Sequence, residues 1–423
     1  MLKYKKIDKT VLIGALSIML AALLWSLDGV FIRPKFYQLP AGLVVFLEHL
    51  LGFLVLSPFI ILNWQKIKKL SKKSWGALIW VAIFGGVIGT IMITKAFFAA
   101  IDGQVTFATV ILLQKLQPVF ALLLARIILK EKLNYKFYMW AGVAILSAYF
   151  LAFAKNGFNV SEINWLHNAA FFAFLAAFAF GSSTVFGKRI VNHLDFKATS
   201  ALRFGLTTLL ILILILLTGD INQISNLSGA QWGYLWLIVF TSGAAAIFIY
   251  YFGLKKVSAS MATIAELFWP FSAVILDYVL NKNVLNGVQI IAALALLISF
   301  YMVVKYGREK RTFMAKVVSG LQRGRRLGFP TANLDKIDLD IAHGIYSVEI
   351  KFGQTIYKGV LHFGHKDTFG EGVSNEVLIK NFEGNLYGKN VQIKIIKKIR
   401  DIKKFKDIKN LKKAIGKDLK MIE

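Results

Sequence analysis

The chain has 423 residues, and its content of 57% hydrophobic and 17% charged residues excludes an ordinary soluble protein, in which about a quarter of the residues are charged. Its 51 Lys and Arg residues outnumber its 23 Asp and Glu residues, but most basic residues flank apolar segments, so we expect a lipid bilayer and no nucleic acid as partner. Cysteine is absent, which excludes disulfide bonds and thiolate metal sites.

The chain up to about residue 305 contains apolar stretches long enough to cross a bilayer, which takes about 20 residues. The first stretch follows the basic start MLKYKKIDK, as in a signal peptide, but its apolar run is too long and no small-residue cleavage site follows. We therefore interpret it as the first of ten transmembrane helices. The ten helices are predicted at residues 10–32, 41–62, 75–98, 104–126, 136–154, 164–186, 199–218, 231–253, 258–280 and 286–305.

The basic residues are divided unevenly between the loops that join these helices. With the N-terminus on the inner side, the inner segments hold most of the Lys and Arg residues, and the outer segments hold only Arg33, Lys35, Lys155 and Lys282. Because Lys and Arg accumulate on the cytoplasmic side of membrane proteins, both termini are predicted to be cytoplasmic. We expect a multi-pass protein of the cell's inner (plasma) membrane.

The helical part contains an internal repeat. Residues 112–134 align with residues 264–286 without a gap, so that Pro118 falls on Pro270. The chain has only six prolines, and two of them at matching depths of the fourth and ninth helices indicate a duplication. An odd number of helices per half makes the two five-helix halves inverted relative to each other, as in many secondary transporters. The predicted repeats cover residues 10–154 and 164–306.

The same part of the chain resembles the ten-helix EamA-type branch of the drug/metabolite transporter superfamily. The resemblance rests on Trp25 near the end of the first helix, the block LQPVFALLLA…LKEKL, and Arg203-Phe204 at the start of the seventh helix. In the first half the chain departs from this pattern, because Glu48 and His49 stand where a basic residue is usual. The resemblance implies that residues 1–308 form a permease for a small molecule, although members of the family differ widely in substrate.

Polar side chains within the predicted helices are costly to place in a membrane and are candidates for a transport site. Two groups of them precede Pro118 and Pro270, where a proline bends the helix and frees a backbone carbonyl, and we interpret these groups as functional. The candidate transport residues are Glu48, His49, Lys95, Gln114, Lys115, Gln117, Glu266 and Trp269.

Other interpretations of single residues stay open. Glu48 can instead form a buried structural ion pair with Lys95 or Lys115. Three charged residues lie near helix ends, where their side chains can reach the aqueous interface; these are Asp28, Arg126 and Asp277. Close helix packing, rather than contact with a ligand, is the role predicted for Gly85, Gly86 and Gly89.

The sequence pattern changes after about residue 312. Apolar and polar side chains alternate there as they do in half-buried strands. The predicted strands cover residues 344–352, 355–363, 375–382 and 391–399, with turns at 353–354 and 383–385. Apolar residues from Ile402 to Leu419 then recur every three or four positions among lysines, which indicates an amphipathic helix. Residues 312–423 are therefore predicted to form a small antiparallel β-barrel with a C-terminal helix.

The stretch RGRRLGFPTANL, residues 323–334, has the composition of a phosphate-binding loop followed by a Pro-Thr-Ala-Asn turn. Glycines let the backbone approach a phosphate, arginines pair with its oxygens, and Thr and Asn oxygens suit Mg²⁺. The candidates are Gly320, Arg323, Gly324, Arg325, Gly328 and Pro330 for a nucleotide, and Thr331 and Asn333 for the metal. On composition alone, a basic loop beside a membrane is equally compatible with contact to anionic lipids.

The order of motifs from VVSGLQRGRRLGFPTANL to KIRDIKKFKDIKNLKKAIGKDL resembles riboflavin kinase along the whole tail. That family is a six-stranded barrel that transfers the γ-phosphate of ATP to the ribityl 5′-hydroxyl of riboflavin and forms FMN. The resemblance implies Glu376 as the catalytic carboxylate, because a primary hydroxyl needs a base to orient its attack. It also implies that residues 320–330 hold ATP, that Thr331 and Asn333 hold Mg²⁺, and that Arg400 lies near the flavin.

Three positions depart from the riboflavin kinase pattern. Asp367 stands in place of a proline, Leu378 in place of a histidine, and Ile402 in place of an acidic residue. The carboxylate, the Thr-Asn pair and the glycine loop remain, so activity is expected. No adenylyltransferase sequence precedes the barrel, so FMN rather than FAD is the expected product.

We therefore expect a membrane permease for riboflavin joined to a cytoplasmic kinase that phosphorylates riboflavin on arrival. One alternative is a permease for another small metabolite whose tail binds flavin as a regulatory sensor. Another is an exporter of a different small molecule that carries a kinase domain without coupling to it.

Overall fold

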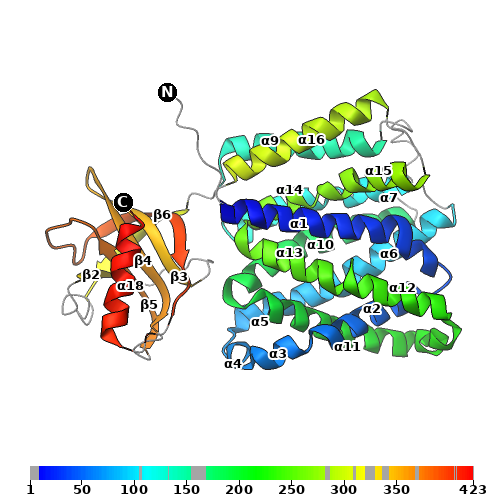
Figure 1. The fold of residues 1–423 in the computed structure, drawn as a ribbon, viewed down its shortest axis with the longest axis horizontal. Helices are drawn as coiled ribbons and strands as arrows, with labels where there is room; N and C mark the ends of the chain where they lie inside the picture. The colour runs from blue at the N-terminus through cyan, green and yellow to red at the C-terminus, as the bar shows by residue number, and fades with distance from the viewer. Residues whose placement is uncertain are drawn as a thin grey trace. The chain divides into compact units, whose positions relative to one another are not determined.

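The chain consists of two compact units, Met1–Arg308 and Glu309–Glu423. The first unit is helical and the second is a β-barrel with a C-terminal helix (Figure 1). The computed structural model describes residues 9–103, 107–131, 133–153, 168–281, 286–307, 311–319, 329–335, 343–366, 371–403, 405 and 407–422.

The helical unit is a bundle of mostly apolar helices. In chain order these are α1 (Lys9–Leu27), α2 (Ala41–Leu56), α3 (Pro58–Leu62), α4 (Trp64–Ile67), α5 (Lys72–Trp80), α6 (Gly89–Ile101), α7 (Phe107–Gln114), α8 (Gln117–Ile128), α9 (Tyr135–Phe153), α10 (Asn168–His193), α11 (Phe196–Thr218), α12 (Gly229–Phe240), α13 (Ala244–Lys256), α14 (Ala259–Ala265), α15 (Phe268–Asn281) and α16 (Gly287–Tyr306). Two π-helical segments, Asp28–Ile32 and Val81–Ile88, continue α1 and α5, and 3-10 turns occupy Arg33–Phe36 and Asp220–Asn226.

Six helical segments in the described part of the chain are long and apolar enough to cross a membrane. They are Lys9–Phe36, Lys72–Ile101, Ala170–His193, Phe196–Thr218, Gly229–Lys256 and Gly287–Tyr306, and two shorter apolar helices are Ala41–Leu56 and Gln117–Ile128. The predicted class, a helical membrane protein, is confirmed. The predicted count of ten spans is matched only in part, because some predicted spans consist of two shorter helices.

Two of the predicted spans are interrupted at the prolines of the internal repeat. In the first half, α7 ends at Gln114 and α8 begins at Gln117, with Pro118 in its first turn. In the second half, α14 ends at Ala265 and α15 begins at Phe268, just before Pro270. A proline lacks the amide hydrogen that would continue the preceding turn, and its ring clashes with that turn. The breaks therefore follow directly from the repeated prolines.

The two halves of the bundle pack in matching ways. Helix α1 contacts α13, α14 and α15, and the corresponding helix of the second half, α10, contacts α6, α7 and α8. Helix α2 pairs with α11, and α9 pairs with α16, which runs beside it in Figure 1. Contacts that recur between halves in this way are typical of a duplicated transporter bundle.

Glycines in the π-helical segment after α5 and at the start of α6 allow α10 and α11 to approach this backbone. A Cβ atom built on Gly85 would collide with the Ser183 side chain, and one built on Gly86 would collide with the Thr207 side chain. A Cβ on Gly89 would lie 2.8 Å from the Phe180 ring. The predicted packing role of these glycines is confirmed.

The second unit is a closed antiparallel barrel of six strands, as the resemblance implied. The strands are β1 (Arg311–Val318), β2 (Thr331–Leu334), β3 (Gly344–Phe352), β4 (Thr355–Lys366), β5 (Glu371–Ile379) and β6 (Asn390–Arg400), and they are joined in the order β1-β2-β5-β4-β3-β6. The core contains Val348, Ile350, Leu361, Val377 and Ile393. The predicted barrel fold is confirmed.

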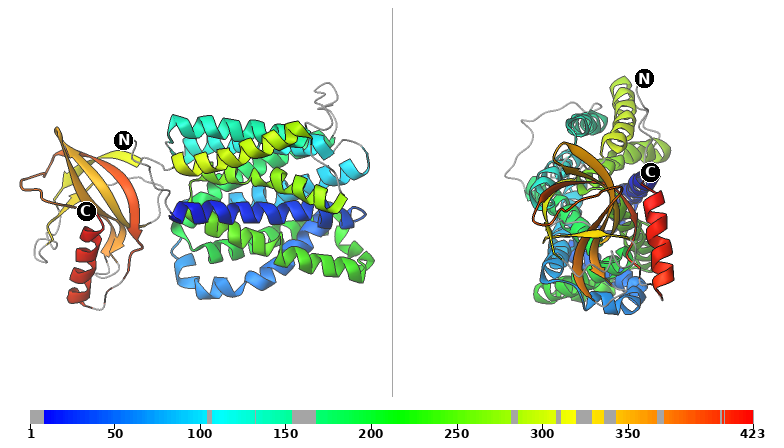
Figure 2. Two further views of the ribbon diagram at one scale, coloured as in Figure 1. Left: turned by 45° about the horizontal axis from the view of Figure 1, so that its top comes forward. Right: turned by 90° about the vertical axis from the view of Figure 1, so that its left-hand side faces the viewer.

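Helix α18 (Ile408–Lys420) lies against the outside of the barrel (Figure 2). The side chains of Leu419 and Ile422 pack with Ile345 and Val360 of the wall. The helix begins at Ile408 and not at Ile402, because the Asp407 side chain caps it by accepting a 2.7 Å hydrogen bond from the amide of Asn410.

A second correction concerns the predicted Pro-Thr-Ala-Asn turn, since its last three residues begin strand β2.

Candidate functional site

The helical unit encloses a cavity of about 160 Å³ that is lined from both halves of the bundle. Its walls come from α1 and the π-helical turn that follows it, from α2, α6, α10, α11 and α13, and from the two broken helix pairs α7/α8 and α14/α15. The breaks expose backbone and polar side chains in the middle of the bundle, where a regular helix would present only its side chains. This arrangement is the usual setting of a small-molecule site in a membrane bundle.

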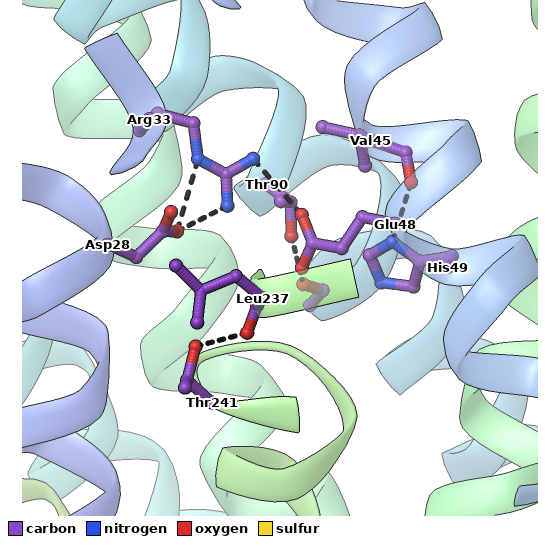
Figure 3. A network of polar contacts seen from close by, with 9 residues as sticks. Asp28, Arg33, Val45, Glu48, His49, Thr90, Leu237 and Thr241 are labelled. Carbon is purple, nitrogen blue, oxygen red and sulfur yellow. Dashed lines mark hydrogen bonds and ion pairs between the residues drawn. The ribbon is translucent and has the colours of Figure 1, made fainter. Parts of the chain in front are cut away.

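A buried group of three charges lines one part of this cavity (Figure 3). Arg33 donates to Asp28 Oδ2 from both Nη2, at 2.5 Å, and Nε, at 3.1 Å, and it donates to Glu48 Oε2 from Nη1 at 3.0 Å. All three residues are at most 7% exposed. The single guanidinium group thus neutralises part of the charge of two carboxylates that would otherwise be buried without a counter-charge.

Local backbone geometry brings Asp28, Arg33 and Glu48 together, and these three residues are called the charge triad below. Asp28 opens a π-helical turn, which holds one more residue than a regular turn and so changes the direction in which side chains point. Arg33 opens the 3-10 turn that follows, with a proline in its first positions. Glu48 lies in the middle of the buried helix α2.

The triad corrects three sequence expectations. The partner of Glu48 is Arg33, and neither Lys95 nor Lys115 forms the pair that was the alternative interpretation. Asp28 is buried in the cavity wall and does not reach toward the interface, because Arg33 offsets its charge there. Arg33 itself belongs to the interior and not to an outer loop.

His49 lies beside this triad on α2 and is 3% exposed. Its Nδ1 atom lies 2.8 Å from the carbonyl oxygen of Val45, one helical turn earlier. Its ring stacks on Phe204, with 4.8 Å between the ring centroids. These contacts fix the plane of the imidazole in the cavity wall.

A second polar group surrounds Glu266, which lies at the α14/α15 break. Tyr250 donates a 2.7 Å hydrogen bond to Glu266 Oε1, and Thr184 lies 3.4 Å from the same oxygen. Gln117, at the α7/α8 break, donates to the other oxygen of Glu266. The carboxylate therefore joins the two broken helices of the two halves across the cavity.

The other predicted transport residues differ in whether they line the cavity. Gln114 and Trp269 line the cavity. Lys115 lies against Trp269, with its ammonium nitrogen 4.5 Å from the ring centroid, as in a cation–π contact. Lys95 is exposed, lies over the Phe172 ring at 5.5 Å and is not part of the cavity lining. The structure thus brings the predicted set together except for Lys95.

Sequence reasoning missed several cavity residues. Thr184 and Tyr250 carry no sequence signal of their own, because hydroxyl and aromatic residues are common in apolar helices. Arg203 carries a sequence signal only as part of a family pattern. The structure buries this residue, and its Nη2 atom donates to the Gly85 carbonyl oxygen at 3.1 Å. Asp28 is predicted to lie near a helix end with its side chain at the interface, although a charge next to an apolar run is itself a signal of function.

Helix α14, which is followed directly by Glu266, is held at its other end by a buried carboxylate. Glu131 is 1% exposed and accepts hydrogen bonds from the amides of Ala259 at 2.8 Å and Ser260 at 3.1 Å. These amides are the unsatisfied donors at the start of the helix. Glu131 therefore fixes the position of the short helix that carries Glu266.

In the barrel, the predicted kinase residues share one outer face of two paired strands. Asn333 of β2 lies directly opposite Glu376 of β5, and Thr331 lies opposite Leu378. Thr331 Oγ1 is 3.4 Å from Glu376 Oε2. The intervening Val377 points into the core and is fully buried. A hydroxyl, an amide and a carboxylate thus lie together, and oxygen donors of this kind fit Mg²⁺.

A hollow of about 360 Å³ reaches Thr331 but is not lined by Asn333 or Glu376. Its lining includes Pro330 and Thr331 from the segment that leads into β2, together with Phe382, Leu386 and Tyr387. The predicted nucleotide-binding residues Gly320, Arg323, Gly324, Arg325 and Gly328 lie outside the described residues, as does Asp367.

Arg400 has a partner within the domain. Its Nε and Nη2 atoms donate to the carboxylate of Asp418 on α18 at 2.9 and 2.7 Å. Asp418 is only 4% exposed, so this two-point ion pair ties the helix to the end of β6. The predicted flavin contact of Arg400 stays a prediction beside this structural contact.

Comparison with known proteins identifies both units. The model of the EamA-like transporter family matches residues 12–153 and again residues 167–305, and the riboflavin kinase family matches residues 308–423. The chain is 39% identical over 293 residues to the Riboflavin transporter ImpX of Fusobacterium nucleatum subsp. nucleatum. This alignment covers 69% of this chain and 97% of that protein.

The tail has its own relatives. It is 34% identical over 108 residues to the RNA-binding riboflavin kinase RibR of Bacillus subtilis, which covers 25% of this chain and 47% of that protein. The chain thus spans about half the length of this kinase relative. A solved crystal structure, described only as a protein, is similar to the chain with a TM-score of 0.55 and 18% sequence identity. The match covers 72% of this chain and 99% of the chain in that crystal structure, and it shows the fold alone.

Proposed function

We propose that this chain, which belongs to the EamA-like transporter family and ends in a riboflavin kinase domain, carries riboflavin across a membrane and phosphorylates it to FMN with ATP. One observation carries the proposal. The helical unit aligns with nearly the whole length of a protein named as a riboflavin transporter, and the kinase family whose substrate is riboflavin follows it in the same chain.

The cavity of the helical unit is the site that we assign to riboflavin. Trp25, Tyr250 and Trp269 give it aromatic walls, which suit the flat isoalloxazine ring. Glu48, Gln117 and Glu266 add polar groups from both halves, which suit the hydroxyls of the ribityl chain. A site shared by two halves that move against each other is the basis of alternating access.

In the kinase domain, Glu376 is proposed to accept the proton of the ribityl 5′-hydroxyl. The hydroxyl oxygen then bonds to the γ-phosphorus of ATP, the bond from that phosphorus to the bridging oxygen breaks, and ADP leaves. Thr331 and Asn333 are the residues that would hold Mg²⁺, which neutralises phosphate charge when it is bound. Arg323 and Arg325 are assigned to the phosphates of ATP.

Coupling between the units follows from the charge of the product. The phosphate of FMN carries about −1.5 to −2 charges near neutral pH, so FMN crosses an apolar layer far less readily than riboflavin does. We propose that both termini face the cytoplasm of a plasma-membrane protein, as the distribution of basic residues predicts. Phosphorylation inside the cell would then retain the flavin and drive net uptake without an ion gradient.

The enzymatic half of the proposal is tested with the purified full-length chain in detergent, riboflavin and Mg-ATP. FMN formation, separated by chromatography, is expected for the unchanged chain and is expected to fall by at least about 100-fold in Glu376→Gln. Glu349→Gln is the matched control, because this carboxylate lies on β3 in a half-exposed pair with Lys394 and its loss should leave FMN formation unchanged.

Two outcomes would contradict this assignment. Equal FMN formation by Glu376→Gln and the unchanged chain would exclude Glu376 as the catalytic carboxylate. Stoichiometric flavin binding without any FMN formation would exclude the kinase activity and favour a flavin sensor that regulates transport.

A further inference from the structure

Buried polar atoms without a hydrogen-bonding partner are concentrated around one place in the helical unit. Within the described residues of that unit, six such side-chain atoms occur, and five of them belong to residues that line the cavity. These are Asp28 Oδ1, Thr94 Oγ1, Gln114 Oε1, Arg203 Nε and Ser242 Oγ. The five residues come from five different segments of the bundle, so no single local distortion accounts for them.

Leaving buried polar atoms without partners is unfavourable, and native proteins keep few of them. A concentration at one cavity therefore points to groups that a ligand satisfies when it binds. The residues around them are otherwise well bonded, as the contacts of Arg33 and Glu266 show. The atoms without partners therefore belong to particular side chains of the cavity and do not indicate poor packing there.

Asp28 shows this division within one side chain. Its Oδ2 atom receives both hydrogen bonds from Arg33, whereas its Oδ1 atom has no partner among the described residues. Arg33 holds the Asp28 carboxylate in a fixed orientation, and Asp28 is 7% exposed. Oδ1 is therefore a pre-oriented acceptor for an N–H or O–H group of a ligand in the cavity.

The remaining atoms define what else the ligand must offer. Gln114 Oε1 is another acceptor, and the Nε–H of Arg203 is a donor only. The hydroxyls of Thr94 and Ser242 can donate or accept. A site with both kinds of group in one cavity suits a neutral ligand that carries carbonyl oxygens together with N–H or O–H groups.

The acceptor of Asp28 lies next to an aromatic wall. A Cβ atom built on the neighbouring Gly29 would lie 3.1 Å from the Trp269 ring and 3.7 Å from the Phe97 ring. The missing side chain leaves the backbone beside Asp28 close to these two rings, both of which line the cavity. A flat ligand in the cavity can therefore contact an aromatic face and the polar atoms at the same time.

We propose that Asp28, Thr94 and Ser242 are specificity-determining residues of the transport site and hydrogen-bond the polar groups of a neutral aromatic substrate. This inference rests on the proposed function, because it takes riboflavin as that substrate. Riboflavin carries an imide N–H, ring carbonyls and ribityl hydroxyls, so it offers both the donors and the acceptors that the cavity requires.

The test measures two quantities for the full-length chain. Riboflavin binding at the transport site is taken from the half-saturation concentration of riboflavin entry into proteoliposomes without ATP, because the kinase domain is a second riboflavin site in the same chain, and thermal stability is measured in detergent. Thr94→Val keeps the shape of the side chain and removes a hydroxyl that has no partner among the described residues. It should therefore leave the melting temperature of the ligand-free protein unchanged or raised, and it should weaken riboflavin binding by about 5- to 10-fold. Ser242→Ala should behave in the same way. Asp28→Asn should weaken binding at least as much, because its amide group replaces an acceptor with a donor.

Thr208→Val is the matched control. The Thr208 hydroxyl donates to the Phe204 carbonyl oxygen at 2.8 Å, and the residue is not part of the cavity lining. This variant should lose some stability and keep riboflavin affinity. Absence of riboflavin binding by the unchanged chain would refute the proposed function. Binding by the unchanged chain with the same affinity in Thr94→Val and Ser242→Ala would refute this inference alone.

Discussion

Removal of Arg33 tests whether the cavity wall depends on the shared cation. Arg33→Gln takes away the counter-charge of Asp28 and Glu48, which are 7% and 6% exposed, and leaves two carboxylates close together. Counting its three charged hydrogen bonds at about 1.5–3 kcal/mol each would give an upper value of roughly 4.5–9 kcal/mol. Relaxation and entry of water reduce this value, so we expect a loss of about 3–5 kcal/mol, as for other broken buried ion pairs.

A triple variant separates charge from packing. Arg33→Gln combined with Asp28→Asn and Glu48→Gln keeps the side-chain volumes nearly constant and removes all three charges. Because no charge is then left buried without a partner, its free energy of unfolding should lie within about 1–2 kcal/mol of the unchanged chain. The free energy is measured by denaturant unfolding in detergent, followed by far-ultraviolet circular dichroism. Equal stability of Arg33→Gln and the unchanged chain, or a triple variant as unstable as the single one, would refute the reasoning.

Two further predictions concern packing and the C-terminal helix. Gly86→Ala should destabilise the helical unit by about 1–3 kcal/mol in a thermal melt, because its Cβ would collide with the Thr207 side chain. Gly76→Ala should be neutral or stabilising, because the new Cβ would meet no side chain and no backbone of another element within 4 Å. Asp418→Asn should weaken the tie to Arg400 by about 1–3 kcal/mol and speed amide hydrogen exchange throughout α18, and unchanged exchange would show that the ion pair does not hold the helix.

The class of fold and the division of the chain follow from simple sequence signals. Apolar runs predict the bundle, alternation predicts four of the six barrel strands, and the repeated prolines mark both broken helices. Strand β2 could not be foreseen, because it has only four residues, Thr331–Leu334, and begins immediately after a proline. Its place in the sheet depends on pairing with β5, which is a contact between distant parts of the chain.

The candidate transport site could be predicted only in part. Charges and amides within apolar runs point to Glu48, Gln117 and Glu266, and these residues line one cavity. The partner of Glu48 could not be read from the sequence, because a regular helix would end near Arg33 and place it outside the bundle. The π-helical turn at Asp28 changes that path, and no periodicity in the sequence reports such a turn.

The central claim, uptake of riboflavin coupled to its phosphorylation, is tested most directly in proteoliposomes that contain Mg-ATP only inside. Riboflavin is added outside, and internal FMN is measured over time for the full-length chain and for Glu376→Gln. The account predicts continued accumulation of internal FMN with the unchanged chain, whereas the variant should only equilibrate riboflavin. Equal FMN in both, or no entry of riboflavin in either, would contradict it.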